Sequence, residues 1–260
     1  TNRMAKYTLA STLEVVEEIK AMGTAAYGKL EAQVPDLQDF VAQIQDLLPR
    51  IRQKTPGVTT GVIEQHDGYF ALEDATPEEI KKRLKHPKEY WGGGHGIASD
   101  TQVIKQADVI AMLGLVHEEY DVEVLKKNFA YYEPRTEHGS SLSACMYGMV
   151  ACAMGEPDLA YPYFMKSAMA EIRGGGKQWA GLVYIGGTHP AAAGGAWKNL
   201  VQGFLGLEKV KEMGNHPRTW RLTPRLPKHF TRVRVPFVHQ GIRYEAAATH
   251  EDWTVEKIDG

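Results

Sequence analysis

Apolar residues recur at every third or fourth position along most of the chain, which is the spacing of one face of an α-helix. The first such stripe consists of Leu9, Leu13, Val16, Ile19 and Met22, so the chain is predicted to begin inside a helix. The same spacing predicts further helices over residues 37–48, 103–115, 122–129, 141–154, 158–172 and 191–207. Small residues on these helices, among them Gly148, Gly194 and Gly195, are typical of closely packed helix pairs in a bundle or a toroid.

Local signals refine some of these boundaries. Asp36 is a candidate N-cap for the helix over residues 37–48, and Pro49 is expected to end that helix. Thr76-Pro77-Glu78-Glu79 is a capping box with proline at the first helical position, and it predicts a short helix. Between these helices, residues 62–70 predict an extended segment with an Asp-Gly turn.

The helical spacing gives way to alternation near the C-terminus. Residues 232–237 place an apolar side chain at every second position, and Gln240-Gly241 supplies a turn before a second alternating run. This pattern predicts an antiparallel β module. We therefore expect a helical domain over residues 1–215 and a β module over residues 216–260.

Composition narrows the range of functions. The 260 residues carry a formal net charge of -2, without the excess of basic residues that nucleic-acid binding requires. No apolar run approaches the roughly 20 residues of a membrane-spanning helix. Cys145 and Cys152 lie in one predicted helix at a separation of roughly 10 Å, too far for a disulfide. Two buried, reduced cysteines agree with a cytoplasmic protein.

One polar segment, Tyr131-Tyr132-Glu133-Pro134-Arg135-Thr136-Glu137-His138-Gly139-Ser140-Ser141-Leu142-Ser143, ends at the start of a predicted helix, and we call it the serine-pair segment. Backbone N–H groups and the positive end of a helix dipole favour an anion there, and hydroxyl groups can donate to its oxygens. On the local pattern alone, a simple helix cap by Ser140 or Ser141 is the favoured interpretation.

Two other motifs carry candidate polar ligands. His189 precedes the predicted helix over residues 191–207, where it could bind an anion or a sugar hydroxyl or make a structural hydrogen bond. Lys105 and Gln106 lie at the start of the predicted helix over residues 103–115, where a lysine is usually solvated. The glycine-rich segments 90–96 and 173–179 predict loops near a site. Four aromatic residues on or beside these loops are either sugar-stacking platforms or packed side chains: Trp91, Tyr131, Tyr132 and Trp179.

Taken together, three strings resemble the disaccharide phosphorylases of glycoside hydrolase family 65, such as kojibiose, nigerose and maltose phosphorylases. They are Val-Ile-Lys-Gln-Ala-Asp-Val, the serine-pair segment, and Gly-Thr-His-Pro-Ala-Ala-Ala-Gly-Gly-Ala-Trp. The resemblance extends over nearly the whole chain. It implies the later part of an (α/α)6 barrel followed by a small antiparallel β-sandwich domain.

The resemblance also implies roles for individual residues. Phosphate is expected on Ser140, Ser141 and His189, and the glucosyl unit on Lys105 and Gln106. The implied reaction is inverting phosphorolysis of an α-linked glucose disaccharide to β-glucose 1-phosphate and an acceptor. Inorganic phosphate is the co-substrate, and neither a cofactor nor a metal is implied. The complete enzyme is expected to be a cytoplasmic homo-oligomer, such as a dimer, that acts on neither nucleic acid nor membranes.

One departure from the family is large. The family's general-acid glutamate lies in a Gly-Pro-Asp-Glu-Tyr type segment just upstream of the position of Thr1, and this sequence has no such segment. Loss of a general acid typically costs about 10²- to 10⁴-fold in rate. We therefore expect no catalytic residue in this chain and a partner segment upstream that carries the acid.

Two alternatives stay open. An α-glucoside hydrolase on the same scaffold would use Glu137 or Glu133 as a base, and an assay with and without phosphate would separate it from a phosphorylase. A non-catalytic sugar-binding or assembly subunit would have kept the fold after losing the acid. The acceptor sugar and its linkage do not follow from the sequence.

Overall fold

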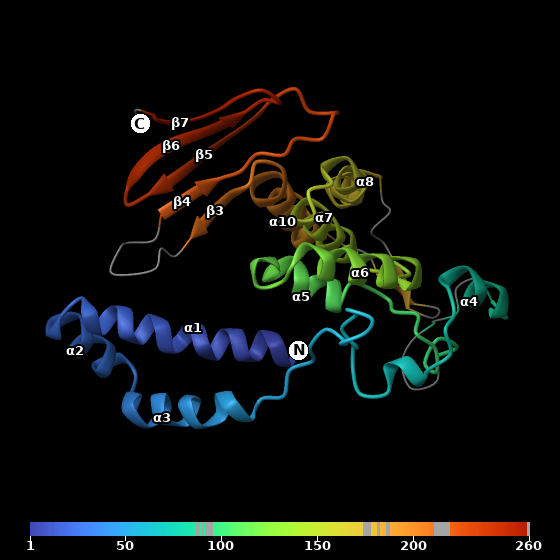
Figure 1. Ribbon diagram of the computed structural model, residues 1–260, viewed down its shortest axis with the longest axis horizontal. Coiled ribbons are helices and arrows are strands. Elements are labelled where there is room, and N and C mark those ends of the chain that lie inside the picture. The colour runs from blue at the N-terminus through green and yellow to red at the C-terminus, as the bar shows by residue number, and fades with distance from the viewer. Residues whose placement is uncertain are drawn as a thin grey trace. The chain divides into compact units, whose positions relative to one another are not determined.

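The structure is a computed structural model that describes residues 1–86, 89, 91, 96–173, 178–180, 183–185, 188–210 and 219–258. The chain forms two compact units, residues 1–55 and residues 56–260 (Figure 1). The predicted domain boundary near residue 215 falls in a stretch outside the described residues, as do most of the glycines of the two predicted loops.

The first unit consists of three helices: α1 (Asn2–Ala21), α2 (Thr24–Gln33) and α3 (Leu37–Leu47). α1 packs against both α2 and α3. Pro49 lies in the 3₁₀ turn that ends α3, as predicted. Asp36 does occupy the N-cap position, but its side chain makes no capping hydrogen bond. Its backbone adopts the left-handed conformation with φ of 58°, which aspartate tolerates better than most residues.

The second unit contains the remaining helices and strands. The helical elements in chain order are η2 (Tyr69–Ala71), α4 (Pro77–Arg83), α5 (Val109–Leu115), η3 (His117–Glu119), α6 (Val122–Tyr132), η4 (Glu133–Arg135), α7 (Ser143–Ala153), α8 (Pro157–Ala168), α9 (Ala170–Arg173), α10 (Pro190–Lys198) and the π-helix η5 (Asn199–Phe204). The strands are β1 (Gln178–Ala180), β2 (Val183–Ile185), β3 (Leu207–Val210), β4 (Thr219–Leu222), β5 (Val233–His239), β6 (Ile242–Ala248) and β7 (Trp253–Lys257).

Helix α7 is the centre of this unit, and α5, α6, α8 and α10 all pack against it. Its sequence is apolar or small on every side, which is typical of a helix that is buried all round. Tyr147, Val150 and Ala151 are completely buried. They belong to one continuous core that also includes Val235 of β5 and Ala246 of β6. The helices and the β module therefore share a hydrophobic core.

The strands form three separate antiparallel sheets, β1–β2, β3–β4 and β5–β6–β7. The turn predicted at Gln240-Gly241 joins β5 to β6, and both residues have positive φ angles, 50° and 78°. Such angles at both central residues match the right-handed twist of a hairpin. The register pairs Phe237 with Tyr244, and their rings stack at 5.5 Å between centroids.

The predicted helix boundaries were partly right. The capping box at Thr76 and Glu79 is present, with both reciprocal hydrogen bonds. The helix predicted over residues 103–115 begins only at Val109, because residues 104–105 instead hydrogen-bond to the segment that follows η4. The helix predicted over residues 191–207 changes from α to π at Asn199. Sequence periodicity cannot detect either change, since both depend on partners far along the chain.

A partly buried ionic chain connects η3 to the β3–β4 hairpin. His117 Nε2 lies 3.3 Å from Glu208 Oε1, and Glu208 Oε2 lies 2.6 Å from Arg221 of β4. The Glu208 carboxylate raises the pKa of His117, with a smaller contribution from Glu118, while burial and Lys198 oppose the shift. In return, His117 and Arg221 hold the pKa of Glu208 at about 2.

We predict that the ion pairs of His117, Glu208 and Arg221 make the free energy of unfolding fall above neutral pH. The raised pKa of His117 means that its protonated form stabilises the fold fully below the unfolded value of about 6.5, and that this contribution is lost as pH rises through the folded value. The low pKa of Glu208 adds stability that is lost only as pH falls from about 4.5 towards 2. The free energy of unfolding, measured in urea from pH 5 to 9, should therefore decline more steeply for the wild type than for His117→Gln. Parallel profiles for the two proteins would contradict this assignment.

Candidate functional site

Backbone pairing places the predicted sugar-binding pair beside the serine-pair segment. The Ile104 N–H donates to Arg135 O, the Glu137 N–H to Ile104 O, and the Gly139 N–H to Lys105 O, each at 2.9 Å. Lys105 therefore lies alongside the residue that precedes Ser140. Lys105 and Gln106 are exposed, and they lie in a bend before α5 rather than at a helix start, which corrects the sequence prediction.

The Ser143 hydroxyl ties this segment to helix α7. It accepts the Ala107 N–H at 3.0 Å and lies 2.9 Å from His138 Nδ1. Ser143 is only 1% exposed, so both partners are fixed inside the protein. Burial lowers the pKa of His138 to about 4, and the ring is therefore neutral near pH 7. No sequence pattern singled out Ser143 or His138 as a site residue.

The two serines of the predicted phosphate loop differ in their surroundings. Ser140 Oγ accepts the Leu142 N–H at 3.3 Å, and its carbonyl accepts the Ser143 N–H at 3.1 Å. Ser140 thus closes the turn before α7, but the N-cap residue is Leu142 and no side chain caps this helix, so the predicted capping role of Ser140 or Ser141 is wrong. Ser141 is partly exposed in the same turn. Both hydroxyl groups lie at the N-terminal end of α7, where the helix dipole favours an anion.

Helices α7 and α10 run parallel in tight contact. A β-carbon added at Gly195 would lie 2.4 Å from Cys145 Sγ, and one at Gly148 would lie 2.4 Å from Asn199 Oδ1. Further along the pair, a β-carbon at Gly203 would lie 2.9 Å from Cys152 Sγ. The paired residues advance together in the same chain direction. When this pairing is extended towards lower residue numbers, the start of α10 lies at the same end of the helix pair as the start of α7.

His189 is the N-cap residue of α10 and is fixed by Glu171 of α9. Its Nδ1 lies 2.7 Å from Glu171 Oε1, and its backbone N–H donates to the same oxygen. The side chain of His189 is 20% exposed. With Nδ1 directed at the carboxylate, Nε2 is the ring atom left to face a ligand. No sequence pattern pointed to this partner, which lies 18 positions away.

Both lysines and glutamates act electrostatically within and beside the serine-pair segment. Burial raises the pKa of Glu137, whereas Lys105 and Lys81 lower it. Burial lowers the pKa of Lys166, and Glu133 opposes that shift. Three lysines therefore act electrostatically on this segment or its neighbours, and their field adds to that of the helix ends. The arrangement favours an anionic ligand.

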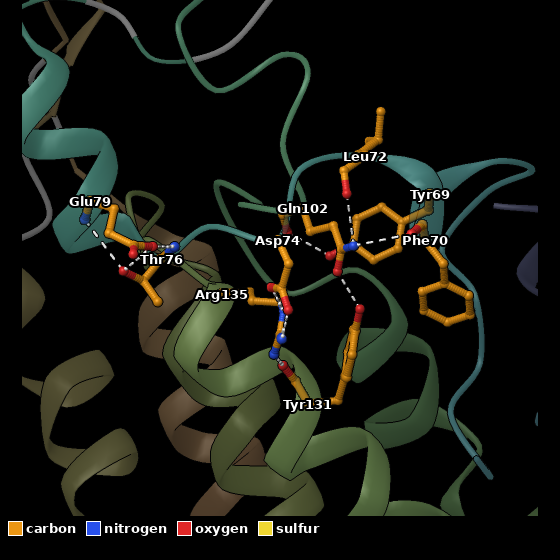
Figure 2. A network of polar contacts seen from close by, with 9 residues as sticks. All are labelled: Tyr69, Phe70, Leu72, Asp74, Thr76, Glu79, Gln102, Tyr131 and Arg135. Carbon is orange, nitrogen blue, oxygen red and sulfur yellow. Dashed lines mark hydrogen bonds and ion pairs between the residues drawn. The ribbon is translucent and has the colours of Figure 1, made fainter.

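A polar network holds the start of the serine-pair segment (Figure 2). Arg135 donates to both carboxylate oxygens of Asp74, at 2.8 and 2.7 Å, and its guanidinium lies 4.1 Å from the centre of the Tyr131 ring. The Tyr131 hydroxyl donates to Gln102 Oε1, and Gln102 Nε2 donates to Leu72 O at 3.0 Å. The residues that flank Lys105 and Gly139 are thus held by side chains as well as by backbone pairing.

The aromatic residues proposed as stacking platforms are mostly packed. Tyr132 is completely buried, and its hydroxyl donates to Ile63 O at 2.5 Å. Tyr131 is engaged by Arg135 and Gln102, and Trp91 packs against a small core that includes Ile80. The side chain of Trp179 lies outside the described residues.

The described part of the chain holds neither a membrane-spanning helix nor a cluster of metal ligands. None of its helices is long and apolar enough to cross a membrane. Among these residues, no group of three or more His, Cys, Asp or Glu side chains is placed to hold a metal ion. Cys145 and Cys152 are both buried and free, as their spacing predicted.

Comparison with known proteins places this arrangement among enzymes. The model of the glycosyl hydrolase family 65 central catalytic domain matches residues 1–198. Nigerose phosphorylase of Lachnoclostridium phytofermentans is 49% identical over 100% of this chain and 34% of its own length. The 1,2-alpha-glucosylglycerol phosphorylase of Bacillus selenitireducens is 33% identical over 98% of this chain and 32% of its own length. The chain therefore spans about a third of the length of these curated relatives.

A solved structure described as a putative kojibiose phosphorylase from the human microbiome has the same fold. It matches with a TM-score of 0.72 at 22% identity and covers 99% of this chain and 33% of its own. This likeness confirms the predicted fold class, a part of a helical barrel followed by a small antiparallel β region.

We predict that Ser143→Ala detaches the Lys105 segment from α7. The substitution leaves the Ala107 N–H without its acceptor, which typically costs about 1–3 kcal/mol for a buried group. Amide hydrogen exchange at Ala107 should accelerate. The free energy of unfolding should fall by about 1–3 kcal/mol. Ser140→Ala is the matched control, because Ser140 Oγ makes a longer bond in a partly exposed turn. Equal effects of the two substitutions would contradict the tie.

Proposed function

This chain belongs to glycoside hydrolase family 65, and from that membership we propose that it supplies the phosphate site and part of the glucosyl site of an inverting α-glucoside phosphorylase. In this reaction a phosphate oxygen attacks the anomeric carbon of the glucosyl unit. The glycosidic bond breaks, and a carboxylic acid protonates the departing oxygen. The products are β-glucose 1-phosphate and the acceptor. An upstream segment of the complete enzyme supplies the acid.

The observation that carries this proposal is the parallel register of α7 and α10. It brings two helix N-termini to one end of the pair, and each carries roughly half a positive charge. Ser140 and Ser141 at one helix and His189 at the other offer donors to the oxygens of one phosphate. The lysine field supports the same ligand, and Lys105 lies beside it through its bond to Gly139.

The sugar side of the proposed site follows from the same pairing. Lys105 and Gln106 are exposed next to the serine-pair segment, so a glucosyl unit held by them would present its anomeric carbon to the bound phosphate. Positioning of this kind supplies much of the rate enhancement in a two-substrate reaction. Inorganic phosphate is the co-substrate, and the residues assigned to the site need no cofactor.

Hydrolysis is the second candidate, and one observation favours it. The Glu137 carboxyl group folds back over Gly139, and burial raises its pKa, as would suit a general base near neutral pH. Glu133 is a weaker candidate because it already accepts the Tyr163 hydroxyl at 2.9 Å. Cleavage by the complete enzyme that does not depend on phosphate would favour hydrolysis and count against the phosphorylase.

We also propose that the complete enzyme is a cytoplasmic homo-oligomer with a domain boundary near residue 215. The two buried, free thiols support a reducing compartment. Sheet β5–β6–β7 supports a C-terminal β module over residues 216–260, which packs on the helical core.

We predict opposite effects of two substitutions in the complete enzyme. Ser141→Ala should raise the KM for phosphate about tenfold or more, because it removes a hydroxyl that binds a charged ligand. The KM for the disaccharide should change little. Lys105→Ala should do the reverse. Release of glucose 1-phosphate, followed while each substrate is varied in turn, measures both effects.

Two controls complete this experiment. Lys126→Ala removes an exposed lysine of α6 that pairs with Glu123 on the same helix, and its kinetics should match those of the wild type. The chain without the upstream segment should release almost no glucose 1-phosphate. Strong phosphorolysis by this chain alone would overturn the assignment of the acid.

A further inference from the structure

Asn199 is a completely buried polar residue at the point where α10 becomes a π-helix. Its Nδ2 donates to Cys145 O in the first turn of α7 at 2.8 Å. Its Oδ1 lies against Gly148, where a β-carbon would come within 2.4 Å. Short π-helical segments are often found at functional sites. Asn199 itself lies inside the helix pair, away from the helix ends that form the proposed phosphate site.

A buried side chain at this position needs only to fill space, yet Asn199 carries two polar amide atoms. Its Oδ1 is buried without a hydrogen-bond partner among the described residues, and an unsatisfied buried oxygen costs stability. A leucine would carry no such polar atom, but its larger side chain would be crowded against Gly148. A single buried asparagine fixes the register of paired helices in coiled coils, at a comparable expense of stability.

The geometry of the α7–α10 pair allows Asn199 to fix the register of these two helices. The hydrogen bond to Cys145 O is directional, whereas the neighbouring contacts of Gly195 with Cys145 and of Gly203 with Cys152 are non-polar and close. A slip of α10 by one residue along its axis would move His189 about 1.5 Å relative to α7. Such a shift exceeds the tolerance of a hydrogen bond, whose length varies over only about 0.5 Å.

We propose that Asn199 is a positioning residue: by bonding to Cys145 O it sets the register of α10 on α7, and so the distance from His189 to the Ser140-Ser141 turn. This inference rests on the proposed function, because the distance matters only if one phosphate bridges the two helix ends. Asn199 touches neither substrate and acts through His189.

Asn199→Leu in the complete enzyme tests the proposal. The KM for phosphate should rise about tenfold, the equivalent of one lost hydrogen bond to a charged ligand, while the KM for the disaccharide stays unchanged. Loss of the unsatisfied oxygen raises the melting temperature, whereas crowding beside Gly148 and the lost bond to Cys145 O lower it, so the KM values of the folded variant decide the test. Gln202→Leu, in the same π-helix, is the matched control and should leave both KM values unchanged.

Asn199→Asp provides a second readout if the leucine variant folds poorly. An ionised aspartate cannot donate to Cys145 O, but a protonated one can. The KM for phosphate, divided by the wild-type value at the same pH, should therefore fall towards one as pH is lowered. A merely structural role would not produce this recovery in phosphate binding alone.

The outcomes separate this inference from the proposed function. Absence of phosphate-dependent cleavage by the wild-type complete enzyme would refute the proposed function. If the wild type is a phosphorylase and Asn199→Leu folds with an unchanged KM for phosphate, the positioning role is wrong. An equal rise in both KM values would also overturn it.

Discussion

Close contact between helices α7 and α10 is the constraint on which the rest of the site depends. Glycines at 148, 195 and 203 leave no room for a β-carbon, so the helix axes can approach until the cysteine and asparagine side chains of the partner fill the space. At this distance the bond of Asn199 to Cys145 O selects one axial register in the proposed site. That register decides which residues meet at the N-terminal ends, and it does so from within the core, several residues away from the proposed ligand.

The second element of the proposed site is a non-helical segment with a sequence pattern typical of a helix. Residues 103–108 have the apolar spacing of a helix start, yet Ile104 and Lys105 make backbone hydrogen bonds to Arg135, Glu137 and Gly139. These bonds, the Ser143 hydroxyl and the Arg135–Asp74 pair fix the segment by independent contacts. Its position thus comes from partners at long sequence separation rather than from local propensity.

Features with local causes could be predicted from the sequence. The capping box at Thr76, the hairpin turn at Gln240-Gly241 and the buried thiols follow from a few adjacent residues. The residues expected at the site were identified through family motifs, and the structure brings Lys105 beside the serine-pair segment by direct hydrogen bonds. The bond of His189 to Glu171 and that of Asn199 to Cys145 could not be predicted, because each depends on how two helices are placed in space.

The hydrogen bond from Gly139 to Lys105 also bears on how strongly each proposed ligand affects the binding of the other. In the proposed site, the segment of Lys105 is joined through Gly139 to the turn of Ser140 and Ser141, so ordering of one segment favours ordering of the other. A ligand that immobilises one side therefore reduces the conformational entropy that the second ligand must overcome. By thermodynamic linkage, the benefit is equal in both directions. The two substrates of such a site would bind cooperatively even without touching each other.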